Sequence, residues 1–189
     1  MKKLKVETVN LHNLTMDDIQ RQQHRVKIIL LNSKNEILLC RRNGVYNFIG
    51  GNIEEGEGPL ECAQREVREE TGVTIGSGNF EVPFYKLQCY EKNYYNLGSN
   101  YYTTIQFLVG NTDAQVDLDK RQLDENELKQ VFVLEYVPYP LLRETLERNR
   151  TIAKKEQSEF IIDEMLHVLD QYDEYCIQTK NTRGIDEER

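Results

Sequence analysis

The chain has 189 residues, which favours one domain, and its 39% hydrophobic and 30% charged residues are typical of a globular protein. Its longest apolar runs are four residues, far below the roughly 20 that cross a bilayer, and no apolar signal segment follows Lys2 and Lys3. A cytoplasmic protein with no membrane partner is therefore expected. The net charge of −8 argues against a general binder of nucleic-acid polymers, because such proteins present a basic surface.

The N-terminal part of the chain predicts strands around one short helix. Residues 4–11 have strand composition, and Thr15 with Asp18 fits a capping box that opens a short helix. Residues 25–31 and 36–41 are rich in β-branched and apolar side chains, and a polar turn separates them. These two segments predict a β-hairpin.

The next predicted element is a helix over residues 60–71. Pro59 suits the first helical turn, the segment itself contains neither Gly nor Pro, and Gly72 fits a C-terminal cap. One face of this helix is apolar, and a second face, about 100° away, carries three carboxylates. The apolar face comprises Leu60, Ala63 and Val67, and the acidic face comprises Glu66, Glu69 and Glu70.

The acidic face admits two interpretations. Like charges three and four residues apart repel one another on a helix, so something must offset the repulsion. The face could be exposed to solvent and eased by Arg65 and Arg68, as most charged helix faces are. Alternatively, it could bind divalent cations, because carboxylate oxygens are ligands that Mg²⁺ and Mn²⁺ prefer.

Further strands and two helices complete the predicted order of elements. Residues 80–90 and 101–109 predict a second hairpin with a long polar loop, and residues 131–134 predict a short strand. Helical spacing of apolar residues follows Pro138 and Pro140 and recurs from Phe160 onward. The last helix carries a charge of −7 over residues 156–176, and it either packs on its own domain or forms a homodimer contact.

The cysteines and histidines predict no metal site of their own. None of the seven forms a CxxC pair or a cluster with ligand spacing, so the thiols are expected to be reduced. They are Cys40, Cys62, Cys89, Cys176, His12, His24 and His167.

Residues 51–73 resemble the Nudix box, G-x5-E-x7-R-E-U-x-E-E-x-G-U, in which U is a bulky aliphatic residue. Every prescribed position is filled, by Gly51, Glu57, Arg65, Glu66, Val67, Glu69, Glu70, Gly72 and Val73. A chain of this composition would match the fixed positions by chance on the order of 10⁻⁵ times. Before the box, where the family often has Leu-Pro-Gly, this chain has Phe48-Ile49-Gly50.

The resemblance implies an α+β fold, an α/β/α sandwich in which a mixed β-sheet lies between helices. The Nudix domain would cover residues 22–148, after an N-terminal extension over residues 1–21. An additional C-terminal helix over residues 149–177 and a flexible tail over residues 178–189 would follow.

The resemblance also implies an activity and a set of site residues. Members typically hydrolyse a nucleoside diphosphate linked to another moiety, by attack of water on phosphorus, with Mg²⁺ or Mn²⁺. The implied metal ligands are the carbonyl of Gly50 and the carboxylates of Glu66, Glu69 and Glu70. The implied catalytic residues are Glu66, Arg65, Glu69 and Glu127, with Glu66 and the loop residues Glu125 and Glu127 as alternative bases. Gly51, Glu57 and Gly72 would have structural roles within the box.

The expected partner is a small phosphorylated nucleotide rather than a nucleic-acid polymer. Arg41 and Arg42 could contact phosphate or pair with the box acids, and the two interpretations weigh equally. Phe48 could stack on a base or belong to the core. Tyr90 lies near a tyrosine position of diadenosine-polyphosphate members, although the chain has 11 tyrosines. The alternative function is a catalytically weak Nudix-fold module that binds a nucleotide or regulates.

Overall fold

The computed structural model describes residues 4–123 and 125–186, the side chains of residues 95, 126, 127 and 180–186 excepted. The described chain contains strands and helices, and its strands form a mixed sheet, in agreement with the α+β class. In chain order they are β1 (Lys5–Val9), η1 (Met16–Asp18), β2 (Arg21–Leu31), β3 (Glu36–Arg42), β4 (Val45–Phe48), α1 (Pro59–Thr71), η2 (Ser77–Asn79), β5 (Tyr85–Glu91), η3 (Tyr94–Asn96), β6 (Tyr101–Asn111), η4 (Leu118–Lys120), α2 (Glu125–Leu128), β7 (Phe132–Pro138), α3 (Tyr139–Lys155) and α4 (Glu159–Asp186).

One mixed sheet of seven strands organises the fold. Its strand order is β1-β5-β6-β2-β3-β4, and β7 pairs with β3 beside this path. The pairs β1/β5 and β2/β6 are parallel, whereas β2/β3 and β5/β6 are antiparallel. The two predicted hairpins are therefore confirmed, and the predicted N-terminal strand joins the same sheet at its edge.

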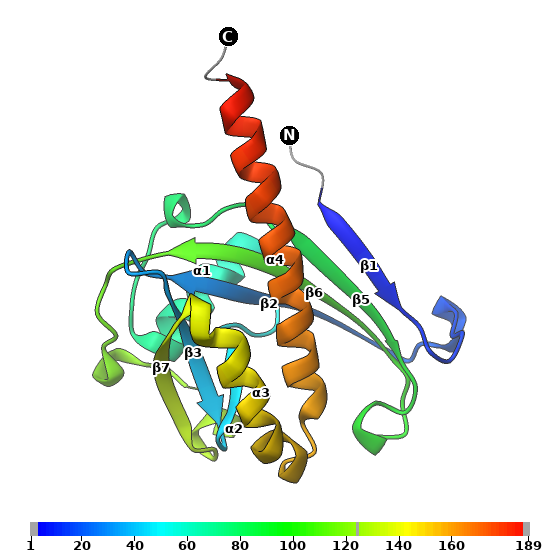
Figure 1. Ribbon diagram of the computed structural model, residues 1–189. Coiled ribbons are helices and arrows are strands. Elements are labelled where there is room, and N and C mark those ends of the chain that lie inside the picture. Colours follow the sequence, from blue (N-terminus) through cyan, green and yellow to red (C-terminus); the bar gives the residue numbers. More distant parts are fainter. Residues whose placement is uncertain (1–3, 124, 187–189) are drawn as a thin grey trace.

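Helices cover both faces of this sheet (Figure 1), with α3 and α4 on one face and α1 on the other. Because side chains alternate along a strand, β2 contributes to two apolar layers. Ile29 and Leu31 pack on the side of α3 and α4, whereas Val26, Ile28 and Leu30 pack on the side of α1. The predicted mixed sheet between helices is confirmed.

The acidic helix α4 packs on its own domain. Its apolar side chains Ile162, Met165 and Val168 are fully buried in the layer that covers the sheet. Of the two interpretations of this helix, the structure shows the packing within the chain. No helix in the described residues combines the length and the apolar character needed to cross a membrane.

Two strand boundaries differ from the prediction. The strand predicted from residue 80 begins only at Tyr85, because Pro83 has no N–H to donate to a ladder, and Phe80 makes a single bridge to Gly110. Strand β7 extends to Pro138 rather than ending at residue 134, because it pairs with β3 along its whole length. Glu135 interrupts the apolar run of this strand and hid its extent from the sequence pattern.

The C-terminal third also differs from the prediction. The expected domain boundary after residue 148 falls inside α3, which is continuous to Lys155. Helix α4 continues to Asp186, through most of the segment expected as a flexible tail from residue 178. The polar composition of that segment predicted no packed element, but polar residues do not prevent a helix.

Candidate active site

Helix α1 presents the box carboxylates beside the sheet. Pro59 occupies its first turn, and Gly72 ends it in the left-handed conformation with φ of 73°. Glu66 is 8% exposed and Glu70 is fully buried, so neither lies on a solvated helix face. The glutamates therefore need partners within the protein, because buried carboxylates are costly when they are unpaired.

Arg65 is the partner of most of these carboxylates. Its guanidinium donates to both oxygens of Glu57 at 2.9 and 3.0 Å, to Glu66 Oε1 at 2.7 Å and to Glu69 Oε2 at 3.0 Å. It also donates to the carbonyl of Asn52 at 2.8 Å, which ties the loop to the helix. Hydrogen bonds from Arg65 lower the pKa of Glu57, and the same carboxylates raise the pKa of Arg65. One arginine thus orients three glutamates.

Arg42 is the corresponding partner of Glu70. Its Nη2 donates to Glu70 Oε1 at 3.0 Å, and the amide of Gly50 donates to the same oxygen at 3.2 Å. The guanidinium lies 5.5 Å from the ring centroid of Phe132. Of the two strand arginines, Arg42 is therefore the one that faces the box. Its ion pair also fits the interpretation in which such an arginine pairs with the box acids.

The two glycines before the helix bring the loop close to the sheet and to Glu66. Gly50 has φ of 144°, and a Cβ there would lie 2.2 Å from the carbonyl oxygen of Val26. A Cβ on Gly51 would lie 2.3 Å from Glu66 Oε1. Larger residues at either position would push the loop away from the carboxylates, so the glycines set the approach of the loop to the helix.

Two residues expected to contact substrate do not reach the box in the structure. Arg41 pairs with Glu135 at 3.1 Å and lies 5.4 Å from the ring centroid of Tyr46, because successive residues of β3 point to opposite faces. Phe48 is 1% exposed within the core beneath α3 and α4. Of the two interpretations of Phe48, the structure shows the core residue, because its strand position points it into that layer.

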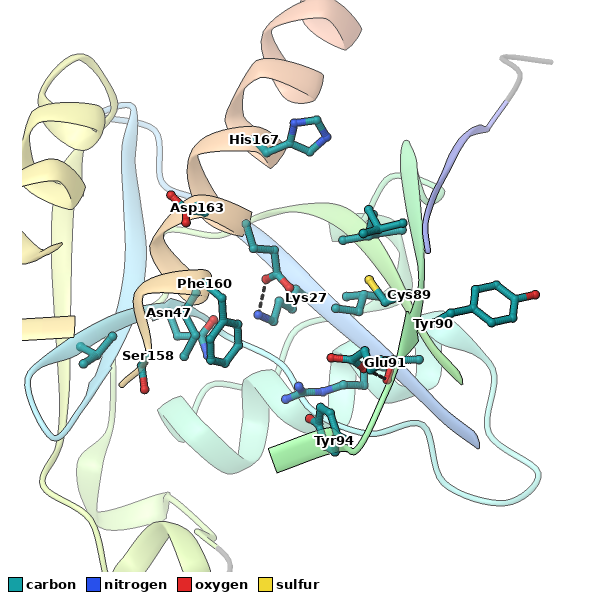
Figure 2. A pocket seen from close by; sticks show the side chains of 18 of the residues that line it. Lys27, Asn47, Cys89, Tyr90, Glu91, Tyr94, Ser158, Phe160, Asp163 and His167 are labelled. Carbon is teal, nitrogen blue, oxygen red and sulfur yellow. Dashed lines mark hydrogen bonds and ion pairs between the residues drawn. The ribbon is translucent and has the colours of Figure 1, made fainter. Parts of the chain in front are cut away.

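The structure describes the position of one further predicted site residue, Tyr90, but not the side chain of Glu127. Tyr90 is at the margin of a cavity beside α4, where its ring packs on Tyr102 at 4.9 Å and points outward in Figure 2. Glu127 is on α2, but its side chain lies outside the described residues, so its proposed catalytic role stays a prediction. The neighbouring Glu125 is exposed.

The donor set of the box fits a hard divalent cation. Glu66, Glu69, Glu70 and the carbonyl of Gly50 supply only oxygen donors, which is the chemistry that Mg²⁺ and Mn²⁺ select. In the part of the chain that the structure describes, no three His, Cys, Asp or Glu side chains converge as a formed metal site. The carboxylates instead face Arg65 and Arg42, from which they would turn to hold an ion.

A cavity of about 1060 Å³ adjoins this cluster on the other face of the sheet (Figure 2). Arg42, which pairs with Glu70, also lines the cavity. Lys27 and Glu91 line it from the sheet, and Phe160 and His167 line it from α4. The box and the cavity are thus connected through one arginine.

The sequence pattern did not identify the charged residues of this cavity as site residues. Arg25 and Lys27 were assigned only to a strand, yet both lie among apolar residues in the segment Arg25–Leu31. A buried lysine is rare unless it is paired, and Lys27 is 4% exposed. The signal that could have indicated them is the spacing of two charged residues, Arg25 and Lys27, on one face of an apolar strand.

Comparison with known families gives one match over most of the chain. A profile described as NUDIX domain matches residues 21–157. The match covers the whole sheet except β1, and it includes the complete helix α3. It therefore extends beyond the residue 148 at which the sequence predicted the domain to end.

Curated relatives match the chain over short segments. The NAD-capped RNA hydrolase NudC of Vibrio parahaemolyticus is 42% identical over 52 residues, which are 25% of this chain and 20% of that protein. NudC of Pseudomonas aeruginosa (strain LESB58) is 41% identical over 66 residues, which are 30% of this chain and 24% of that protein. Nudix hydrolase 25 of Arabidopsis thaliana is 39% identical over 61 residues, which are 31% of this chain and 35% of that protein. These matches span at most 35% of the length of these three relatives.

Solved structures are similar at low sequence identity. The dihydroneopterin triphosphate pyrophosphohydrolase of E. coli has a TM-score of 0.47 and 12% identity, over 75% of this chain and 92% of that one. The MutT protein from Bacillus halodurans has a TM-score of 0.46 and 20% identity, over 65% of this chain and 72% of that one. Because these TM-scores are low, the fold is assigned from the observed sheet and helices and not from these structures.

Proposed function

Because this chain belongs to the Nudix family, we propose that it is a metal-dependent hydrolase of a nucleoside diphosphate linked to a second moiety. The observation that carries the proposal is the assembled box. Glu66, Glu69 and Glu70 lie on one helix face beside the Gly50 loop, and two arginines hold them there. A diphosphate oxygen and an attacking water need such a set of oxygen donors around a cation.

The metal would be Mg²⁺ or Mn²⁺, held by Glu66, Glu69, Glu70 and the carbonyl of Gly50. When bound, the ion supplies charge neutralisation of the diphosphate and lowers the pKa of a bound water. Arg65 keeps the ligand carboxylates oriented toward the loop, and Glu57 holds Arg65 through two hydrogen bonds. Glu66 or Glu127 is the proposed base that accepts the proton of the attacking water.

The cavity beside the box supports the proposed substrate class. Since Arg42 contacts Glu70 and also lines the cavity, a diphosphate at the box would direct one of its two halves into that space. The proposed partner is a small phosphorylated nucleotide. The relatives named NAD-capped RNA hydrolases add RNA with an NAD cap to the substrates to be tested.

The proposal is tested by hydrolysis assays with Mg²⁺ or Mn²⁺. Nucleotide sugars, dinucleoside polyphosphates, ADP-ribose, NAD, NAD-capped RNA and nucleoside triphosphates form the panel. We expect turnover of at least one diphosphate-linked substrate, and loss of that turnover in Glu70→Gln. Glu61→Gln is the matched control, because Glu61 is an exposed residue of the same helix.

Absence of turnover across the panel with either metal would overturn the proposal. If a nucleotide bound under the same conditions without being cleaved, the chain would be a Nudix-fold binding module instead. Turnover that Glu70→Gln left unchanged would place the chemistry outside the box.

A further inference from the structure

Four of the charged side chains that line the cavity beneath α4 come from the sheet and from α4 and have no part in the proposed chemistry. Arg25 and Lys27 come from β2, Glu91 from β5 and Glu164 from α4. The Nζ of Lys27 forms an ion pair with Glu164 across the space between sheet and helix, drawn as a dashed line in Figure 2. Glu91 accepts a hydrogen bond of 2.6 Å from Thr103 Oγ1.

Arg42 aside, two polar atoms at this cavity are buried without a hydrogen bond among the described residues. They are Nε of Arg25, a donor, and Oδ1 of Asn47, an acceptor. Both residues line the cavity. Buried polar groups are nearly always hydrogen-bonded, so an unsatisfied donor and acceptor at one cavity indicate a ligand that supplies both partners.

The charge of the cavity opposes an anionic occupant. Five carboxylates and four lysine or arginine side chains line it, so its formal charge is −1. Two of the cations are already engaged, Lys27 with Glu164 and Arg42 with Glu70. Burial raises the pKa of Glu91, whereas the nearby Arg25 lowers it. A phosphate group placed there would meet carboxylates at close range in a partly desolvated space.

The size of the cavity fits a large polar group. About 1060 Å³ is at the upper end of the range of ligand pockets, and aromatic side chains such as Tyr94 and Phe160 contribute to its walls. A sugar or a nucleoside offers both donors and acceptors without carrying charge. A terminal phosphate of a nucleoside triphosphate offers acceptors and negative charge only.

We propose that this cavity binds an uncharged polar half of the substrate, a sugar or a nucleoside, and that Arg25 is a specificity-determining residue that donates a hydrogen bond to it. The inference rests on the proposed function, and it narrows the substrate class. Diphosphates of neutral sugars are preferred to diphosphates of acidic sugars.

The first test is steady-state kinetics of Arg25→Met on a nucleotide sugar. Loss of a charged hydrogen-bond donor raises KM about tenfold, and kcat stays within about twofold because the box is intact. Arg21→Met is the matched control, since Arg21 is an exposed arginine of the same strand outside the cavity. An unchanged KM in Arg25→Met, or a fall in kcat alone, would overturn the role of Arg25.

The second test compares a nucleotide sugar with its uronic-acid counterpart. The wild-type protein should have a kcat/KM at least tenfold higher for the neutral sugar, and Glu91→Gln should narrow that ratio because one repelling carboxylate is removed. Glu159→Gln is the control, an exposed residue of α4 outside the cavity. Equal kcat/KM values of the wild-type protein for the two substrates would contradict the preference of the cavity for a neutral group.

A binding measurement separates this inference from the proposed hydrolysis. Calorimetry without metal ions would compare a nucleoside, a free sugar and a nucleoside triphosphate on wild type and on Arg25→Met. The inference predicts that the nucleoside or the sugar binds, identifying which half occupies the cavity, and that Arg25→Met weakens this binding about tenfold. Binding without hydrolysis would refute the proposed function alone, whereas binding of neither the nucleoside nor the sugar, or equal binding to wild type and Arg25→Met, would refute the inference.

Discussion

The box on α1 and the cavity beneath α4 are both charged regions, but they differ in how far apart their charged residues lie in the sequence. In the box, the three carboxylates are neighbours in the sequence, and Arg65 on the same helix orients two of them. In the cavity, Arg25, Lys27, Glu91 and Glu164 come from β2, β5 and α4 and meet only in the folded chain. Local spacing therefore reveals the proposed chemistry, whereas the proposed selectivity depends on tertiary structure.

The largest expected effect separates the two regions by kinetics. Glu66→Gln should lower kcat by about 10³-fold, because a proposed metal ligand and base loses its charge. Its KM should stay close to that of wild type, in contrast to Arg25→Met, which should act on KM. Steady-state assays of the two variants on one substrate measure this split. Equal effects of both variants on kcat would contradict the division of roles.

The next effect concerns the orientation of the box carboxylates. Arg65→Lys keeps the charge but loses the planar group that contacts Glu57, Glu66 and Glu69 together, so kcat should fall by 10- to about 100-fold. Added Mg²⁺ should restore part of the loss if the ligands are misplaced rather than absent. Arg148→Lys on the exposed side of α3 is the control. Wild-type kinetics in Arg65→Lys would remove its positioning role.

The ion pair between Lys27 and Glu164 across the cavity can be tested by measuring the free energy of unfolding. Lys27→Met leaves Glu164 without its buried partner and should lower the free energy of unfolding by about 3 kcal/mol. The double variant Lys27→Met/Glu164→Leu should recover most of this loss, because the pair is replaced by apolar side chains. Urea unfolding of wild type, both single variants and the double variant completes the cycle. Additive effects of the two substitutions would show that the pair is not coupled.

The smallest effect is a pH dependence at the box. The pKa of Glu57 is lowered in the folded protein by Arg65, so the protein gains stability from this contact above the unfolded pKa of about 4.3. That stability is lost as the pH falls through the lower folded pKa. Glu57→Gln should therefore weaken the acid sensitivity of unfolding below about pH 4.3, as measured by thermal melts from pH 3 to about pH 7. An unchanged pH profile in Glu57→Gln would assign the acid sensitivity to other carboxylates.

The sequence predicted the box because helical periodicity and cap residues are local signals. Pro59, Gly72 and the glutamate spacing were sufficient to place the helix and its acidic face, and the structure confirms the helix. The burial of Glu66 and Glu70 was not predictable from that pattern, because it depends on the loop at Gly50 and on β3.

The faces of the strands were harder to predict. The sequence does not distinguish Arg41 from Arg42, and only the register of β3 shows that Arg42 faces Glu70 while Arg41 faces Glu135. Phe48 could be a stacking residue or a core residue in the sequence for the same reason, since alternation does not show which face is the core. Lys27 was overlooked because its partner is in α4, far along the chain.

Binding of Mn²⁺ tests the central claim, that the box carboxylates hold the cation used in hydrolysis, most directly. Electron paramagnetic resonance would measure free and bound Mn²⁺ on wild type, on Glu70→Gln and on the control Glu61→Gln. The account predicts bound Mn²⁺ on wild type and on the control, and a decrease in affinity of more than about tenfold in Glu70→Gln. Equal Mn²⁺ affinity in Glu70→Gln and wild type would contradict it.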